Sequence, residues 1–220
     1  MKELKNLLKK ELRLAASPLS FVFLAASLMT LLPGYPILMG SFFICLGSFY
    51  SYLKAREEND VLYSVLLPVK KSDVVAAKYA FAALLQLTGF FLCALLTALR
   101  MTALSGAAPY AENALMNASP TYLAFVLLIF AAFNLFFIGG FFKTAYKIGF
   151  PFLSFGIAAF LLVSVAETLH HLPGLAFLND PAGDKLGLQF LFLAVSAALY
   201  AGITFLACRA SQRRFEKIDL

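Results

Sequence analysis

Six long apolar segments constrain the fold of this chain more than any other feature. Each has about the 17–25 residues that a helix needs to cross a lipid bilayer. The segments cover residues 14–32, 35–53, 74–99, 122–142, 148–166 and 186–208. Backbone polar groups in lipid must bond within their own segment, so helices are expected throughout. Because only 14% of residues are charged, against roughly 25% in soluble domains, the sequence predicts an all-α integral membrane protein with six spans in one domain.

Residues 1–13 predict an amphipathic helix at the membrane interface. Leucines recur there at helical spacing, and basic residues fill the other positions. The alternative is the start of a secretory signal peptide, but the apolar run that follows is longer than usual and further spans come after it. Pro18 is expected to shorten or divide the first span.

The basic residues predict the orientation in the membrane. Of the 18 Lys and Arg residues, 16 lie in the N-terminal segment, the loop and helix start at residues 54–78, the loop at 143–147, and the C-terminal tail. Alternate loops carry only Arg100 and Lys185. The protein is expected in the cytoplasmic membrane of a bacterium. By the positive-inside rule, both termini and the 54–78 loop are expected in the cytoplasm.

The coupling region, residues 54–73, is expected to dock a soluble partner. An acidic group precedes an apolar group, and a basic pair follows. These residues are Glu57, Glu58 and Asp60, then Val61, Leu62, Tyr63, Val65 and Leu66, then Lys70 and Lys71. Apolar residues four apart share a helical face, and Pro68 is expected to end the short helix. Ser72 fits the N-cap of the next helix.

Residues that could carry catalysis or bind a metal are few. Cys45, Cys93 and Cys208 lie in three different spans without ligand spacing, which is typical of small packing residues. Neighbouring His170 and His171 would point about 100° apart on a helix. No nucleotide-binding glycine loop occurs, so no catalytic, cofactor or metal site is expected in this chain. The paired glutamates Glu57 and Glu58 weakly resemble those of intramembrane proteases, which makes such an enzyme a minor alternative.

Two polar residues are expected deep inside the membrane-spanning helices. Gln86 and Asn134 could line a path for a substrate or could bond helices to one another. Neither is charged, which favours the second interpretation. The many Phe residues of the fourth and fifth spans also allow two interpretations. They could pack the helices and face lipid, or they could form an aromatic lining for an amphipathic substrate.

Taken together, these features resemble the permease subunits of ABC-2-type transporters, in the small bacterial class with six spans and no fused ATPase. The resemblance lies in the acidic cluster at 57–60, the apolar helix at 61–67, the Pro68 turn with its lysines, and Lys78-Tyr79, between spans two and three. It extends to the N-terminal helix and the span pattern, and so covers nearly the whole chain. Many relatives have Ser-Arg at positions 70 and 71, where this chain has two lysines.

This resemblance implies a coupling helix at about residues 57–67 that docks on a separate ATPase. Two permeases, either two copies or a copy and a paralogue, would assemble with two ATPases, which would bind the ATP and Mg²⁺. Within the family the chain is most similar to exporters of amphipathic peptides such as phenol-soluble modulins. A membrane scaffold without transport is the main alternative. No nucleic-acid partner is expected, because the basic residues follow the pattern of membrane loops.

Overall fold

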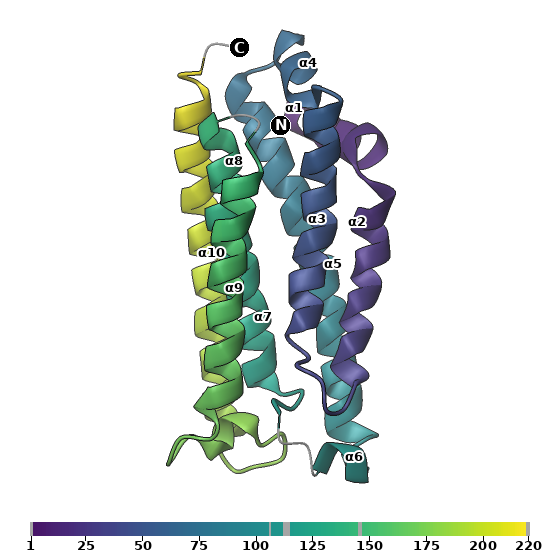
Figure 1. Ribbon diagram of the computed structural model, residues 1–220, viewed down its shortest axis with the longest axis vertical. Coiled ribbons are helices and arrows are strands. Elements are labelled where there is room, and N and C mark those ends of the chain that lie inside the picture. Colours follow the sequence, from purple (N-terminus) through teal and green to yellow (C-terminus); the bar gives the residue numbers. More distant parts are fainter. Residues whose placement is uncertain (1, 106, 112–114, 145–146, 219–220) are drawn as a thin grey trace.

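The computed structural model describes residues 2–105, 107–111, 115–144 and 147–218, and these residues form an all-α bundle (Figure 1). The predicted fold class is confirmed, since no strand occurs among the described residues. The short elements are α1 (Lys2–Lys10), η1 (Glu11–Ala15), α2 (Pro18–Val22), η2 (Phe23–Leu31), α4 (Asp60–Leu66), α6 (Ala108–Ala111) and η4 (Ala176–Asn179). The long rods are α3 (Met39–Glu57), α5 (Lys71–Thr102), α7–η3–α8 (Pro120–Ala132, Phe133–Ile138 and Gly139–Thr144), α9 (Gly149–Leu169) and α10 (Leu186–Phe215).

Four of the described helices are long and apolar enough to cross a membrane. They are Lys71–Thr102, Pro120–Thr144, Gly149–Leu169 and Leu186–Phe215. A fifth span results if the bent pair Leu4–Ala15 and Pro18–Leu31 counts as one. α3 lies alongside these rods in Figure 1 but is outside this apolar set, so the count of six spans stays a prediction.

The N-terminal helices turn sharply before they enter the bundle. Leu4–Ala15 lies at 96° to Pro18–Leu31, and Pro18 occupies the first position of α2. Proline suits a helix start because its missing N–H would have no helical partner there. The first helix along the bundle therefore starts at Pro18, and α1 with η1 crosses one end of the bundle.

Small residues explain why α3 is less apolar than its neighbours. A side chain at Gly47 would lie 2.8 Å from the Cβ of Phe23, and one at Gly40 would lie 2.7 Å from the Ala26 carbonyl oxygen. Ser20 donates to the Gly47 carbonyl at 2.6 Å. Small residues let helix backbones approach closely, as they do where helices associate in lipid. The Gly and Ser residues that allow this close packing also lower the hydropathy of α3.

The core is centred on α7 and η3. Nearly all of α7 is buried, and Phe133 and Phe137 are fully enclosed with ring centroids 4.8 Å apart. Phe137 also contacts Tyr52 of α3 at 5.3 Å. Most Phe residues of this region therefore serve as packing bulk, while others, such as Phe160 at 72% exposure, lie on the bundle surface.

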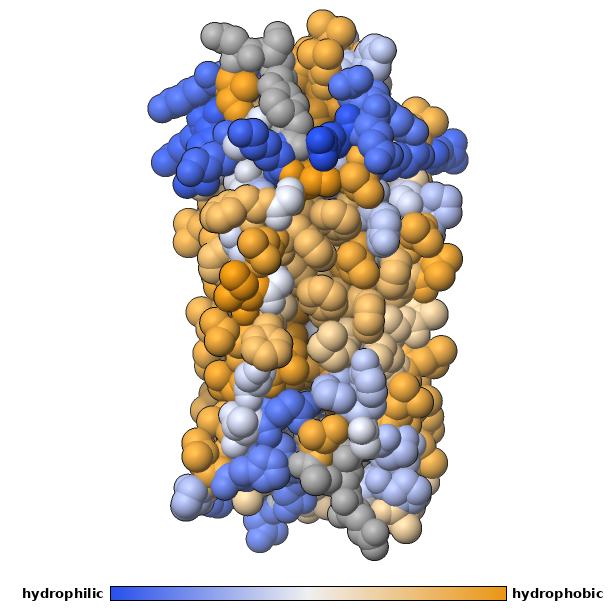
Figure 2. Space-filling view, in the orientation of Figure 1, coloured by the Kyte–Doolittle hydropathy of each residue, from blue (hydrophilic) through white to orange (hydrophobic). Residues whose placement is uncertain are grey.

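The two ends of the bundle differ in charge. We call the end that carries α4 and both chain termini the basic end (Figure 1). Figure 2 shows a hydrophilic belt there above a broad hydrophobic band. At the opposite end, Arg100 donates to the Thr30 carbonyl at 2.8 Å and stacks on Tyr110 at 4.2 Å. A cation suits the carbonyl end of η2, so these contacts fasten α5 to η2.

Candidate functional site

The coupling region forms a short helix separated from its neighbours by two backbone breaks. α3 runs through Glu57, and Asn59 adopts a left-handed conformation at φ 53°. α4 then covers Asp60–Leu66, and Leu67 is extended before Pro68. Glu57 thus belongs to α3, so the helix is shorter than the predicted 57–67.

The start of the following helix also differs from the prediction. α5 begins at Lys71, and the extended Lys70 is its N-cap without a side-chain bond. The Lys70 carbonyl accepts from the N–H groups of Asp73 and Val74, at 2.9 and 3.3 Å. Ser72 is therefore inside the helix, and its predicted capping role is wrong.

The predicted apolar group of α4 divides between two faces. Leu62, Tyr63 and Leu66 are 42%, 65% and 74% exposed, and we call them the α4 apolar face. Val61 is only 6% exposed, and Val65 packs on the core of its own chain. Of the five predicted apolar residues, the three of the α4 apolar face are therefore the ones exposed to another molecule.

The charged residues of the coupling region divide in the same way. Glu57, Glu58 and Lys70 are exposed around α4, while Lys71 donates to the Ile218 carbonyl at 2.8 Å. Asp60 instead points into the protein. It does not belong to a polar rim but to a group of charges beneath α4.

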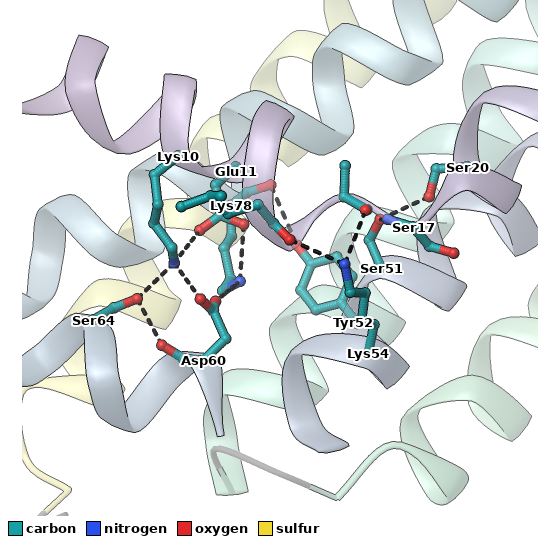
Figure 3. A network of polar contacts seen from close by, with 12 residues as sticks. Lys10, Glu11, Ser17, Ser20, Ser51, Tyr52, Lys54, Asp60, Ser64 and Lys78 are labelled. Atoms are coloured by element: carbon teal, nitrogen blue, oxygen red, sulfur yellow. Dashed lines mark hydrogen bonds and ion pairs between the residues drawn. The ribbon is translucent and has the colours of Figure 1, made fainter. Parts of the chain in front are cut away.

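This group is an ion quartet of two lysines and two acids (Figure 3). Lys78 of α5 contacts Glu11 of η1 at 3.0 Å and Asp60 of α4 at 2.9 Å. Lys10 of α1 pairs with Asp60 and with Glu11, the latter at 3.0 Å. The quartet therefore joins three parts of the chain that are distant in sequence.

Because it is buried, the quartet holds α4 firmly against η1 and α5. The side chains of Lys78 and Glu11 are each only 4% exposed. Desolvation works against the charged form of Asp60, yet Lys78 and Lys10 outweigh it and lower the pKa of that carboxyl. The two positive and two negative charges balance, so each ion has a partner in a region where a lone charge would be costly.

Neutral groups fix the geometry of the quartet. Lys10 donates to the Ser64 hydroxyl at 2.7 Å, and that hydroxyl donates to the Asp60 carbonyl at 2.6 Å. Tyr52 of α3 donates to the Lys78 carbonyl at 3.3 Å. Sequence reasoning placed Asp60 in the site and quoted Lys78 within the family motif without giving it a role, and it missed Lys10 and Glu11. An acid within a basic amphipathic helix and a lysine inside an apolar run were the available signals.

Gln86 and Asn134 lie buried in the middle of the bundle and bond to each other. The Gln86 amide donates to the Asn134 side-chain oxygen at 2.8 Å, and Asn134 donates back at 3.0 Å. Asn134 also donates to Thr204, and Gln86 accepts from Tyr200. These bonds tie α5, η3 and α10 together. Such contacts favour the structural interpretation over a substrate path.

A π turn accompanies this network. Asn134 lies in η3, where the hydroxyl of Tyr79 donates to its backbone carbonyl at 3.2 Å. π turns leave the helical bonding pattern and often occur at functional sites. The α7–η3–α8 rod therefore changes from α-helical to π-helical bonding at the same level as the Gln86–Asn134 pair.

The features considered for an enzyme do not converge. Glu57 and Glu58 lie at the basic end, whereas His170 and His171 follow α9 at the opposite end (Figure 1). Across the described ranges, no group of three or more His, Cys, Asp or Glu is arranged to hold a metal ion. Cys45 and Cys93 are buried, which suits packing residues.

The fold and the apolar helices define a multi-pass α-helical membrane protein. A family model described as ABC-2 family transporter protein matches residues 6–211, and the chain belongs to this family. It is thus a transporter permease, and the family implies an ABC ATPase subunit as its partner. Comparison with curated proteins gave no match, and comparison with solved structures gave none.

Proposed function

We propose that this permease is the membrane subunit of an ATP-driven exporter, and that α4 is its coupling helix. The observation that carries the proposal is the α4 apolar face. Leu62, Tyr63 and Leu66 are exposed on a short helix that lies beside the membrane-spanning rods at their basic end (Figure 1). Large apolar side chains with a charged surround are typical of the centre of a protein interface.

The quartet would transmit a movement of α4 to the rest of the bundle. An ATPase that moves α4 would also move η1 and α5, because Asp60 is held by Lys10 and Lys78. Paired charges in a buried setting resist separation. Closure of an ATPase pair would thereby tilt α5 and reorient the bundle between inward-open and outward-open states.

The working unit in this proposal contains two permeases and two ATPases in a bacterial cytoplasmic membrane. Both termini and α4 would face the cytoplasm, in line with the basic residues at that end. The ATPases would hold the ATP and Mg²⁺. The second permease would be a further copy of this chain or a paralogue.

The proposed substrate is an amphipathic molecule, with cytolytic-type peptides as the first candidates. The support is the resemblance to phenol-soluble modulin exporters together with a bundle rich in aromatic side chains. A scaffold without transport remains the competing function. It is favoured if the purified protein carries no ATPase or does not stimulate one.

The test compares two matched leucine variants. Leu66→Asp places a charge in the α4 apolar face, and Leu172→Asp places one on an exposed leucine at the opposite end, where exposure is 51%. The full chain is purified in mild detergent, and a copurifying polypeptide with a Walker loop is identified and quantified. We expect Leu66→Asp to reduce the recovered ATPase at least about tenfold, as a central interface residue does.

Two readouts complete the test. Membrane levels and helical content of both variants should equal those of the unchanged protein, because both leucines are exposed. In vesicles, amphipathic peptides should stimulate ATP hydrolysis by the unchanged complex and by Leu172→Asp. Recovery of the ATPase with Leu66→Asp at normal yield contradicts the assignment of α4.

A further inference from the structure

A hollow opens at the basic end between α8, α9 and the end of α10. Its volume is about 460 Å³. Three basic side chains from separate segments line it: Lys143 of α8, Lys147 ahead of α9 and Arg214 of α10. Its apolar lining includes Leu135, Phe136 and Phe150.

Small residues create the hollow. Gly139 and Gly140 line it without side chains. A Cβ on Gly140 would lie 2.8 Å from the Cβ of Pro151, so α8 and α9 are in close contact at this point. The hollow lies beside this contact and is open to the surroundings.

The charge of the hollow is of one sign. No acidic side chain is among its described lining residues. The ion pairs found within the described ranges involve Lys10, Lys54 and Lys78, not the three basic residues of the hollow. Lys143, Lys147 and Arg214 are exposed, so their charges are available to an anion.

The polar and apolar parts of the hollow follow the layers of a membrane. Lys143 lies two helical turns beyond Leu135 and Phe136 on the same rod, toward the basic end. Leu135 and Phe136 are 46% and 42% exposed, and both belong to the apolar helix Pro120–Thr144. The hollow thus presents positive charge at headgroup level and apolar surface at acyl-chain level.

We propose that this hollow binds one anionic phospholipid from the leaflet at the basic end. Lys143, Lys147 and Arg214 would hold the phosphate, with the forked guanidinium suited to two of its oxygens. The acyl chains would lie along Leu135 and Phe136. Basic pockets between membrane helices bind anionic headgroups in this way. The apolar lining distinguishes a lipid from free phosphate.

The bound lipid would occupy the place where α8, α9 and α10 meet. The described lining residues of the hollow include no residue of α4 and none of the quartet, so the lipid site is separate from both. The proposal is therefore independent of the docking role of α4.

The test uses adjacent arginines as a matched pair. Arg214 lines the hollow, whereas Arg213 lines a different surface with Phe205 and Arg209. Both are exposed, so Arg214→Gln and Arg213→Gln remove the same charge from one helix at nearly the same depth. The full chain in mild detergent is titrated with phosphatidylglycerol or phosphatidylcholine, and bound lipid is counted by native mass spectrometry.

We expect one tightly retained phosphatidylglycerol and weak retention of phosphatidylcholine. Arg214→Gln should weaken phosphatidylglycerol binding about fivefold, the usual effect of one basic residue near anionic lipid, while Arg213→Gln should not. Phe136→Ala should also weaken it, and excess inorganic phosphate should not displace the lipid. Equal losses in the two arginine variants, equal binding of the two lipids, or displacement by phosphate would overturn the proposal.

Discussion

Lys78 shows how one residue can tie a surface helix to the bundle. Its side chain is 4% exposed, so removal of its charge would leave the carboxylates of Glu11 and Asp60 with Lys10 as their one shared cation in the quartet. Breaking a buried ion pair costs more than the pair contributes, since the remaining charge stays desolvated. Lys10 is 19% exposed and can be replaced in part by water.

The lysine pair gives a prediction about stability. Lys78→Met should lower the free energy of unfolding by about 3–5 kcal/mol, and Lys10→Met by only about 1 kcal/mol. Unfolding in mixed detergent micelles measures both. The second change Glu11→Gln should restore part of the loss in Lys78→Met, because it removes one of the two carboxylates that Lys10 alone would then have to balance. Equal effects of the two lysine variants would mean that burial does not set the strength of the quartet.

Gln86 and Asn134 allow the two roles of buried amides to be separated. Each single change, Gln86→Met or Asn134→Leu, should cost about 1 kcal/mol of stability, because the partner amide loses a bond. If the pair only joins helices, transport per folded molecule stays unchanged. A loss of transport without a loss of stability would assign these amides to the substrate path. Vesicle uptake, normalised to folded protein, decides between them.

Among the elements, α4 depends on the backbone break at Asn59. Asn adopts the left-handed region more readily than most residues, and β-branched residues rarely do. At φ 53° this residue turns the chain from α3 into α4 and sets the direction of the α4 apolar face. The break therefore links local backbone preference to the orientation of the proposed docking helix.

Substitution at this break gives a prediction for the element. Asn59→Gly should leave α4 in place, whereas Asn59→Val should cost about 1–2 kcal/mol and loosen it. Amide hydrogen exchange in Asp60–Leu66 reports the change. The control is Glu58→Val at the preceding residue, whose φ of −88° lies outside the left-handed region. Similar exchange in both valine variants would show that the left-handed turn does not position α4.

Local chemistry made part of this region predictable from the sequence. Pro68 lacks an N–H and restricts Leu67, so the end of α4 followed directly from covalent structure. The quartet could not be predicted from local chemistry, because Lys78 and Glu11 are 67 residues apart in the sequence. The 96° turn before Pro18 brings them together. The start of α5 at Lys71 also differed, because the Lys70 carbonyl supplies the first bonds without a side-chain cap.

Across the whole molecule, apolarity and close packing compete for the same residues. α9 and α10 are apolar and largely exposed, as expected of helices that contact lipid. α3 contains Gly residues that let η2 and α2 approach its backbone. α3 therefore has a lower hydropathy than its neighbours, and it lies inside the range 6–211 that the family model matches.

The distribution of basic residues gives a final prediction, about orientation. The basic end should face the cytoplasm, because lysines and arginines are retained on that side during insertion. Glu57→Cys at that end and Leu172→Cys at the opposite end place exposed thiols at the two surfaces. The background should lack Cys208, which is only partly buried, along with Cys45 and Cys93.

An impermeant thiol reagent applied to whole cells should label Leu172→Cys and spare Glu57→Cys. After the cells are opened, both should react, which controls for the intrinsic reactivity of each thiol. Labelling of Glu57→Cys in intact cells would place α4 outside, where no ATP-hydrolysing subunit could reach the α4 apolar face. The proposed orientation and the proposed docking role of α4 are therefore tested together. The distribution of basic residues predicts the side of the membrane on which Leu62, Tyr63 and Leu66 would bind the ATPase.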